Sequence, residues 1–208
     1  MLNSPVLEAS LVRLEPLTVD HVPGLLEAAT GDRETFRFTG VPHDFDSTYA
    51  YVANALTEQS AGTSIPFATI DMRRGQVAGT TRFMRIEYWD WKPGSFHQRG
   101  EGLPDAVEIG ATWLAPWAQH TGINTEAKLL MLTHAFEVWR LYRVRFSTDA
   151  RNTRSRSAIE RLGAKFEGVL RAHHAAYDGE VRNSAFYSIL DSEWPELKRR
   201  LAERLRRD

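Results

Sequence analysis

The segment Val107-Glu108-Ile109-Gly110-Ala111-Thr112-Trp113-Leu114 is followed by Ala115-Pro116-Trp117-Ala118 and then by Gln119-His120-Thr121-Gly122-Ile123-Asn124-Thr125. The first part is mostly apolar, β-branched or aromatic, and it predicts a buried strand with one acid near its start. The Ala-Pro pair ends this strand, because proline lacks the N–H group that a sheet ladder needs. A polar turn with one glycine comes next, and a long helical pattern begins at Thr125.

A turn of this kind, between a buried strand and a helix, predicts an anion-binding site. The N–H groups in the first turn of a helix have no partner inside the helix, and the helix dipole makes that end positive. We therefore expect an anionic group, such as a phosphate, to bind at residues 119–125.

This turn and a second motif resemble signatures of the GNAT superfamily, the general-control-related N-acetyltransferases. Members have a Gln/Arg-x-x-Gly-x-Gly/Ala turn that holds the pyrophosphate of acetyl-CoA, and Gln119, Gly122 and Asn124 occupy its signature positions here. Residues 152–168, Asn-Thr-Arg-Ser-Arg-Ser-Ala-Ile-Glu-Arg-Leu-Gly-Ala-Lys-Phe-Glu-Gly, resemble the Asn-x-x-Ser-x-x-Ala-Ile…Leu-Gly…Glu-Gly helix of the RimJ/RimL-like branch. The likeness is specific over about 107–170, and the order of the expected elements fits the GNAT fold over the whole chain.

The resemblance implies a role for each site residue. Glu108 lies eleven residues before Gln119, the spacing of the catalytic glutamate in histone-type members, and it is the candidate general base. A structural carboxylate paired with a nearby arginine is the alternative interpretation. Main-chain groups of three residues would pair with the pantetheine arm of acetyl-CoA as an added strand does, and one N–H would polarise the thioester carbonyl. The three residues that would pair with the pantetheine arm are Thr112, Trp113 and Leu114. The cradle for the phosphates would be Gln119, His120, Thr121, Gly122, Ile123, Asn124 and Thr125. Asn152 would form a hydrogen bond with the pantetheine.

Two positions depart from the family pattern. Asn124 replaces the last glycine of the turn, so a Cβ atom limits how closely the backbone approaches the pyrophosphate, although the amide itself can donate. Ile159 stands where many members have a tyrosine that acts as general acid. Ser155 or Ser157 would then protonate the leaving thiolate, unless the thiolate leaves directly to water. The alternative is that both serines only satisfy first-turn N–H groups of their helix.

The composition excludes several classes of function. The chain has 208 residues, 42% of them hydrophobic, which suits one domain over residues 1–208 with a sizeable core. A net charge of −1 gives no field that would attract nucleic acid or an anionic membrane. The absence of cysteine excludes disulfides and thiolate metal sites, and we predict no metal. Because we find neither a signal peptide nor an apolar run of about 18 residues, we expect a cytoplasmic protein.

Hydrophobic periodicity and turn residues predict the remaining elements. Together they form an α/β (α+β) GNAT fold, a mixed central sheet of about seven strands with helices on both faces. The expected strands are 6–14 (a strand or a bent hairpin), 65–71, 76–86, 107–114, 141–149, 166–175 and 180–190. The expected helices are 19–30, 48–60 after a Ser47 cap, one from 121 or 124 to 140, 153–162 and a C-terminal helix within about 192–206.

Residues 87–104 form an insert rich in aromatic residues, glycine and proline. Because a loop of this length is often functional, it could be a flap over the acceptor site or a dimer contact, with an idle insertion as the alternative. The exposed strand edges and this insert permit a homodimer without requiring one.

The acceptor is expected to be a primary amine, either a protein N-terminus, as the RimJ/RimL likeness suggests, or a small molecule. Acids from several loops would favour a cationic acceptor if they line the cleft: Asp32, Glu34, Asp44, Asp46 and Glu87. A basic excess over 140–171 suits the 3′-phosphate of CoA, or is ordinary surface arginine. The alternative function is a non-catalytic acyl-CoA-binding or sensing module, which Asn124 and the missing tyrosine favour and Glu108 disfavours.

Overall fold

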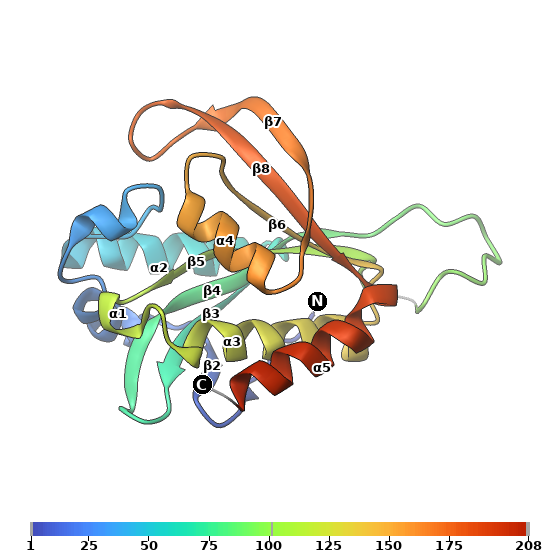
Figure 1. The fold of residues 1–208 in the computed structure, drawn as a ribbon, viewed down its shortest axis with the longest axis horizontal. Coiled ribbons are helices and arrows are strands. Elements are labelled where there is room, and N and C mark those ends of the chain that lie inside the picture. The colour runs from blue at the N-terminus through green and yellow to red at the C-terminus, as the bar shows by residue number, and fades with distance from the viewer. Residues whose placement is uncertain (1, 101, 207–208) are drawn as a thin grey trace.

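The computed structural model describes residues 2–100 and 102–206 and builds them around one mixed sheet (Figure 1). The sheet has eight strands in the order β1-β2-β3-β4-β5-β6-β8-β7. The strands are β1 Leu7–Glu8, β2 Val12–Pro16, β3 Ser64–Asp71, β4 Gln76–Glu87, β5 Ala106–Leu114, β6 Arg143–Asp149, β7 Lys165–Ala175 and β8 Val181–Leu190. The helices are η1 Val19–His21, α1 Val22–Ala28, η2 Arg33–Phe36, α2 Phe45–Ser60, η3 Pro116–Ala118, α3 Gly122–Thr133, η4 His134–Val138, α4 Thr153–Arg161, η5 Asp191–Glu193 and α5 Trp194–Leu205.

The predicted GNAT architecture is confirmed, with eight strands in place of about seven. The extra strand arises at the start of the chain, where residues 6–14, expected as a strand or a bent hairpin, contribute to the hairpin β1–β2. The predicted hairpin of residues 166–190 is present as β7–β8, and β8 inserts between β6 and β7. All neighbouring strands are antiparallel except β5 and β6.

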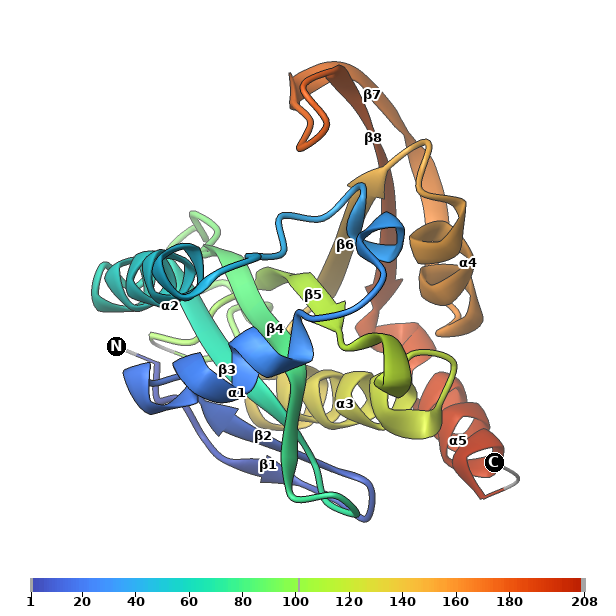
Figure 2. The ribbon, with the colours of Figure 1, turned by 90° about the vertical axis from the view of Figure 1, so that its left-hand side faces the viewer.

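Helices cover both faces of the sheet (Figure 2). Helices α1 and α2 lie on one side, over β3 and β4, while α3, α4 and α5 lie on the other. Helix α3 packs against the sheet through buried Ile123, Ala127 and Met131, which share one stripe. Its predicted continuation to Arg140 is wrong in detail, since regular α-helix ends at Thr133 and a π-helical turn follows.

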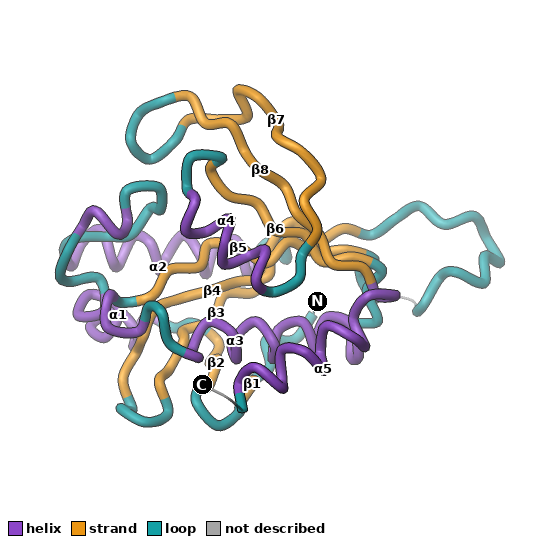
Figure 3. Tube along the Cα trace, in the orientation of Figure 1, coloured by secondary structure: helices purple, strands orange, loops and turns teal. Residues whose placement is uncertain are grey.

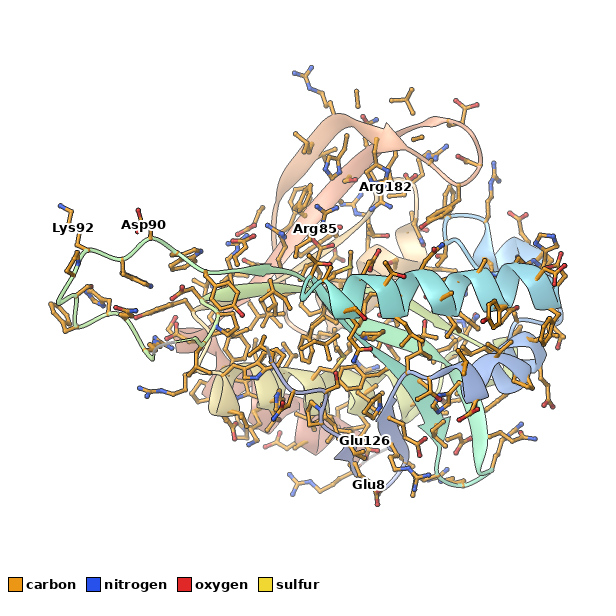
Figure 4. The ribbon with its side chains drawn as sticks, turned by 180° about the vertical axis from the view of Figure 1, so that it is seen from behind. Glu8, Arg85, Asp90, Lys92, Glu126 and Arg182 are labelled. Carbon is orange, nitrogen blue, oxygen red and sulfur yellow. The ribbon has the colours of Figure 1, made fainter. Side chains whose placement is uncertain are left out.

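A carboxylate fixes the first turns of α3 against the edge of the sheet. Glu126 is 5% exposed, and its Oε2 accepts hydrogen bonds from the N–H groups of Leu11 at 2.6 Å and Val12 at 2.8 Å. Its Oε1 accepts from the Ser10 hydroxyl at 2.8 Å. Figure 4 shows Glu126 near Glu8 of the β1–β2 hairpin. The N-terminal end of α3 is therefore held in place by bonds to a distant part of the chain.

Helix α2 begins earlier than the sequence predicted. Asp44, and not Ser47, is its N-cap, and the Asp44 carboxylate accepts from the Ser47 N–H at 2.7 Å. Ser47 instead takes the third helical position and accepts from the Asp44 N–H, which completes a capping box.

Glu87 of the predicted insert ends β4, and the described residues 88–100 and 102–104 leave the sheet as a long arm without helix or strand (Figure 3). At its base, Asp105 accepts from the Trp89 N–H at 2.7 Å and from the Trp91 indole at 2.8 Å. The Trp89 ring stacks on the Tyr142 ring, and the Arg99 guanidinium lies 3.6 Å from the centre of the Tyr142 ring. The arm projects from the end of the sheet opposite to residues 119–125 (Figure 1), so it does not lie over that turn. Residues 1, 101, 207 and 208, including Glu101 of the predicted insert, lie outside the described residues.

Candidate functional site

Strands β5 and β6 part in the middle of the sheet. They pair in parallel only from Ala106 to Glu108 on β5 and from Arg143 to Arg145 on β6. Beyond these residues β5 continues beside β4 and β6 continues beside β8, so their inner edges diverge (Figure 2). Diverging edges leave main-chain N–H and C=O groups that an extended ligand can pair with as an added strand.

A bulge interrupts β5 where the gap opens. Ala111 has a φ of 46°, and the register against β4 shifts between Thr80 and Arg82. A bulge adds one residue to one strand and re-aims its main-chain groups. The predicted pantetheine segment, Thr112 to Leu114, begins directly after this bulge.

The three residues of that segment have different surroundings. The Trp113 side chain is 4% exposed and packs edge-on against Phe36 and Tyr51, while its indole N–H has no partner among the described residues. The Leu114 carbonyl accepts from the Gln119 amide at 2.9 Å. The Thr112 hydroxyl lies on the α3 side of the sheet, where it meets a buried lysine.

This lysine, Lys128 of α3, was not found by the sequence analysis. Its Nζ donates to the hydroxyls of Thr81 and Thr112, both at 2.7 Å, and its side chain is 4% exposed. Burial lowers its pKa to about 7. No motif signals such a residue, because its partners come from two strands far away in sequence. The lysine ties the predicted pantetheine segment to α3.

The turn after β5 has the geometry that an anion site requires. His120 has a φ of 59°, and Thr121 is the N-cap of α3, with its hydroxyl accepting from the Ile123 N–H at 3.3 Å. A Cβ at Gly122 would lie 2.8 Å from the Leu11 Cδ1 methyl, so a larger residue would require the Leu11 side chain to shift. The first-turn N–H groups of α3 have no partner within the helix, and this end of α3 follows β5 through η3.

The residues of the predicted phosphate cradle differ in exposure. The side chains of Ile123 and Thr125 are buried, so these two residues offer only main-chain groups. His120 and Thr121 are exposed, and Asn124 is half-buried at the third helical position.

Gln119 anchors the turn with its side chain. Its Oε1 accepts from the Thr35 hydroxyl at 2.8 Å and from Arg154 of α4 at 2.5 Å, in addition to the bond that its amide gives to Leu114. These contacts join the turn to η2 and to α4, and they occupy the side-chain oxygen of Gln119.

Glu108 lies where β5 and β6 separate, and its carboxylate is fully engaged. The side chain is 4% exposed. Oε1 accepts from the Ser147 hydroxyl at 2.7 Å, Oε2 accepts from Arg145 Nε at 3.0 Å, and Arg85 Nε lies 3.4 Å from the same Oε2. Parallel pairing places Glu108 directly beside Arg145. The sequence analysis missed Ser147 and Arg85, because only the fold brings them to this carboxylate.

Helix α4 presents the residues of the second motif. Asn152 is its N-cap, and its Oδ1 accepts from the Ser155 N–H at 3.0 Å. Ser155 is half-buried and Ser157 is exposed. Residues two apart on a helix lie about 200° apart around its axis, so the two serines cannot both face the gap. Ile159 is buried in the core, where the family's tyrosine would stand.

Several charged groups that the sequence offered to ligands are paired with other protein groups. Asp32 caps η2, and Asp44 caps α2. Glu87 pairs with Arg145 at 3.0 Å. Among the arginines of 140–171, Arg143 pairs with Glu167, Arg151 with Asp149 and Asp178, and Arg156 donates to the Tyr187 hydroxyl.

Across residues 2–100 and 102–206, no group of three or more His, Cys, Asp or Glu side chains could hold a metal ion. Within the same ranges, no helix has both the length and the apolar character that crossing a membrane requires.

Comparison with known proteins identifies relatives of this arrangement. The family model described as an acetyltransferase (GNAT) domain matches residues 12–165. A GCN5-related N-acetyltransferase from Brucella melitensis has a crystal structure with a TM-score of 0.83 and 30% identity, covering 98% of this chain and 86% of that one.

Two further proteins, YdaF and RimJ, are also similar to this chain. YdaF of Bacillus subtilis (strain 168), provisionally named a ribosomal N-acetyltransferase, is 36% identical over 89 residues, which are 42% of this chain and 47% of YdaF. The match therefore spans about half the length of that curated relative. Mycobacterium smegmatis RimJ, solved in complex with CoA-disulfide, has a TM-score of 0.75 and 21% identity over 95% of this chain and 91% of that one, and this likeness shows the shared fold.

Proposed function

The chain belongs to the GNAT acetyltransferase family, whose acyl donor is acetyl-CoA, and from this premise we propose that it is an N-acetyltransferase that moves an acetyl group to a primary amine in a ternary complex. The observation that carries the proposal is the gap between β5 and β6, with Glu108 where it opens and the start of α3 at its far end. This arrangement fits an extended pantetheine arm and its pyrophosphate.

Each part of the gap has a task in this mechanism. The first-turn N–H groups of α3 bind the pyrophosphate, and the free edge of Thr112–Leu114 aligns the pantetheine. A main-chain N–H beside the Ala111 bulge donates to the thioester carbonyl and stabilises the charge that develops on its oxygen. The protein thus holds the acyl carbon where an amine can reach it.

Attack by the neutral amine forms the C–N bond and breaks the C–S bond. The amine nitrogen loses one proton and the departing sulfur takes one up, so the exchange is balanced. Glu108 is the proposed acceptor of the amine proton, directly or through water. Ser155 is the better placed of the two serines to protonate the sulfur, because Ser157 is exposed.

The acceptor class is part of the proposal. The provisional name of YdaF, ribosomal N-acetyltransferase, favours a protein N-terminal amine as the acceptor. A small-molecule amine is the other acceptor that the mechanism accommodates.

A non-catalytic acyl-CoA-binding module is the second candidate function. It is favoured by the contacts of Glu108, whose two oxygens already accept from Ser147 and Arg145. In this second candidate function, the carboxylate serves to fix the two strands together.

Replacing Glu108 by Gln separates the two candidates. For an enzyme, we expect kcat to fall by about 10²- to 10⁴-fold, the contribution of a general base, while calorimetry finds acetyl-CoA affinity unchanged. Ser147→Ala is the matched control, because it removes one hydrogen bond and keeps the carboxylate. Equal losses in both variants, in step with a lower melting temperature, would assign Glu108 a structural role.

A further inference from the structure

The side of the sheet that carries Glu108 also carries a group of arginines, and one of them has no acidic partner among the described residues. Residues Arg145, Ser147 and Asp149 alternate along β6, and the register places Asp149 opposite Ser184 of β8. Glu108 reaches Ser147, so its carboxylate lies on the same face. Helices α3 and α4 cover the opposite face, while on this one α2 lies over β3 and leaves the β6–β8–β7 part uncovered (Figure 2).

Three guanidinium groups, of Arg85, Arg145 and Arg182, and three carboxylates, of Glu87, Glu108 and Asp149, lie at this face. Arg145 is matched, because it pairs with Glu108 and Glu87, both at 3.0 Å. Arg85 comes from β4 with a φ of 48° and shares the Glu108 carboxylate at 3.4 Å. Arg182 of β8 has no carboxylate within 4.0 Å anywhere in the described part of the chain. The Asp149 carboxylate, the other acid on this face, is bound by Arg151 at 2.7 Å.

Arg182 is nevertheless held in a fixed position. Its Nε donates to the Ser184 hydroxyl at 2.9 Å, and Ser184 is fully buried. The His173 ring lies 2.9 Å from the same hydroxyl through Nδ1. Burial lowers the pKa of Arg182, and the charge of Arg85 adds to this effect while Asp149 and Glu108 oppose it. Figure 4 shows Arg85 and Arg182 between the β7–β8 hairpin and α2, and the two charges are near enough for Arg85 to act on Arg182.

We infer that the acceptor carries a carboxylate near its reactive amine and that Arg182, together with Arg85, binds it. The inference rests on the proposed acetyl transfer at Glu108 and names the class of acceptor for that site. A guanidinium held by its Nε, with its Nη atoms unpaired by any described acid, is arranged for a planar carboxylate. One unmatched arginine and one shared arginine suit a single negative charge. Asp32 and Asp44, two of the acids that a cationic acceptor could use, accept backbone N–H groups at the starts of helices.

The carboxylate can come from two sources that share this chemistry. In a small acceptor it is the α-carboxylate of an amino acid, and in a peptide it is an acidic side chain close to the N-terminal amine. The test therefore uses two matched acceptor pairs: a free amino acid against its amide, and a peptide with glutamate against the same peptide with glutamine at its second position.

The first measurement is the ratio of kcat/KM between the anionic and the neutral member of each pair. For the unchanged protein we expect a preference of about 10- to 100-fold for the anionic member of at least one pair, as one charge-assisted hydrogen-bonded pair provides. In Arg182→Gln the ratio falls to about one, and in Arg182→Lys it is intermediate because the charge remains without the planar fork. Arg199→Gln, which changes an exposed arginine of α5, keeps the full ratio.

The second measurement keeps this test separate from the test of catalysis. Calorimetric titration of both acceptor pairs into the CoA-bound protein reports carboxylate preference even if no acceptor is acetylated. Absence of turnover with all acceptors would overturn the proposed function, while selective binding of the anionic members would still support the carboxylate site. No preference in either measurement, or a phosphoserine peptide that binds more tightly than the glutamate peptide, would overturn the inference.

Discussion

At the scale of single residues, Lys128 has the most unusual environment. A lysine that is buried between two threonine hydroxyls, with no acid beside it, has lost the solvation of its charged form. Its pKa is lowered to about 7, while in the unfolded chain it has the ordinary value. Between these two pH values the unfolded chain binds one more proton than the folded protein, so folding stability rises with pH.

We therefore expect Lys128→Met to remove part of the pH dependence of unfolding. In the unchanged protein, Lys128 should make the free energy of unfolding rise by up to about 1.4 kcal/mol per pH unit between about pH 7 and pH 10. Below pH 7 the destabilising effect of the buried lysine should have its full size and no longer change with pH. Denaturant unfolding of both proteins at several pH values measures the difference. Lys128→Arg, which stays charged, serves as the comparison. Parallel stability curves for Lys128→Met and the unchanged protein would contradict the prediction.

The same scale separates what the sequence could reveal from what it could not. Glu108 and the turn at Gln119 are recognisable because their spacing lies within one strand–turn–helix unit. Ser147, Arg85 and Lys128 are not, since each reaches the site from another strand or helix through register and side-chain direction. Local spacing predicts a motif, whereas the partners of a buried charge depend on the tertiary fold.

At the scale of elements, Asn152 has two separable functions, one in helix α4 and one in the proposed complex with acetyl-CoA. As N-cap, the Asn152 side-chain oxygen accepts from the Ser155 N–H, a contact that stabilises a helix by about 1 kcal/mol. In the proposed complex, its amide N–H₂ group would also donate to the pantetheine. An aspartate keeps the first function and loses the second.

We expect Asn152→Ala to lower stability by about 1 kcal/mol and to raise KM for acetyl-CoA. Asn152→Asp should restore the stability and leave KM raised. Thermal unfolding and steady-state kinetics on the three proteins provide both values. Recovery of KM with aspartate would mean that Asn152 acts only through the helix.

Element boundaries show where sequence patterns lose information. Both Asp44 and Ser47 are good capping residues, and the capping box uses both, so composition alone could not choose the first residue of α2. The apolar pattern of α3 continues past Thr133, but the chain widens into a π-helical turn there. In both cases the type of element was predictable, and its end was decided by competition between local hydrogen bonds.

At the scale of the whole molecule, the aromatic arm is attached to the end of the sheet remote from the α3 turn. Its contacts are with Tyr142, with Asp105 and, through Arg99, with Asp191. The arm should therefore matter for stability and assembly more than for the acyl donor. Its length and composition marked it as distinct in the sequence, but its direction could only come from the fold.

Replacing residues 92–102 by a short Gly-Ser turn tests this separation. We expect the melting temperature to fall by about 2–4 °C for each kcal/mol of lost contacts. KM for acetyl-CoA should stay within about twofold, as for distant independent sites. Size-exclusion chromatography of both proteins examines the dimer-contact interpretation. A large rise in KM would show that the arm reaches the donor site after all.

The separation of β5 from β6 also affects how the molecule unfolds. Among the described residues, three pairs join β1–β5 to β6–β8–β7 along the sheet, so without the acyl donor the two parts share a short seam. A donor that pairs with the free edge of β5 would lengthen that seam and couple the two parts into one cooperative unit. Hydrogen exchange should then slow on both sides of the gap when acetyl-CoA is added, including amides of β6 that the ligand does not touch. Acetyl-CoA would then act as an added strand beside β5 as well as the acyl donor.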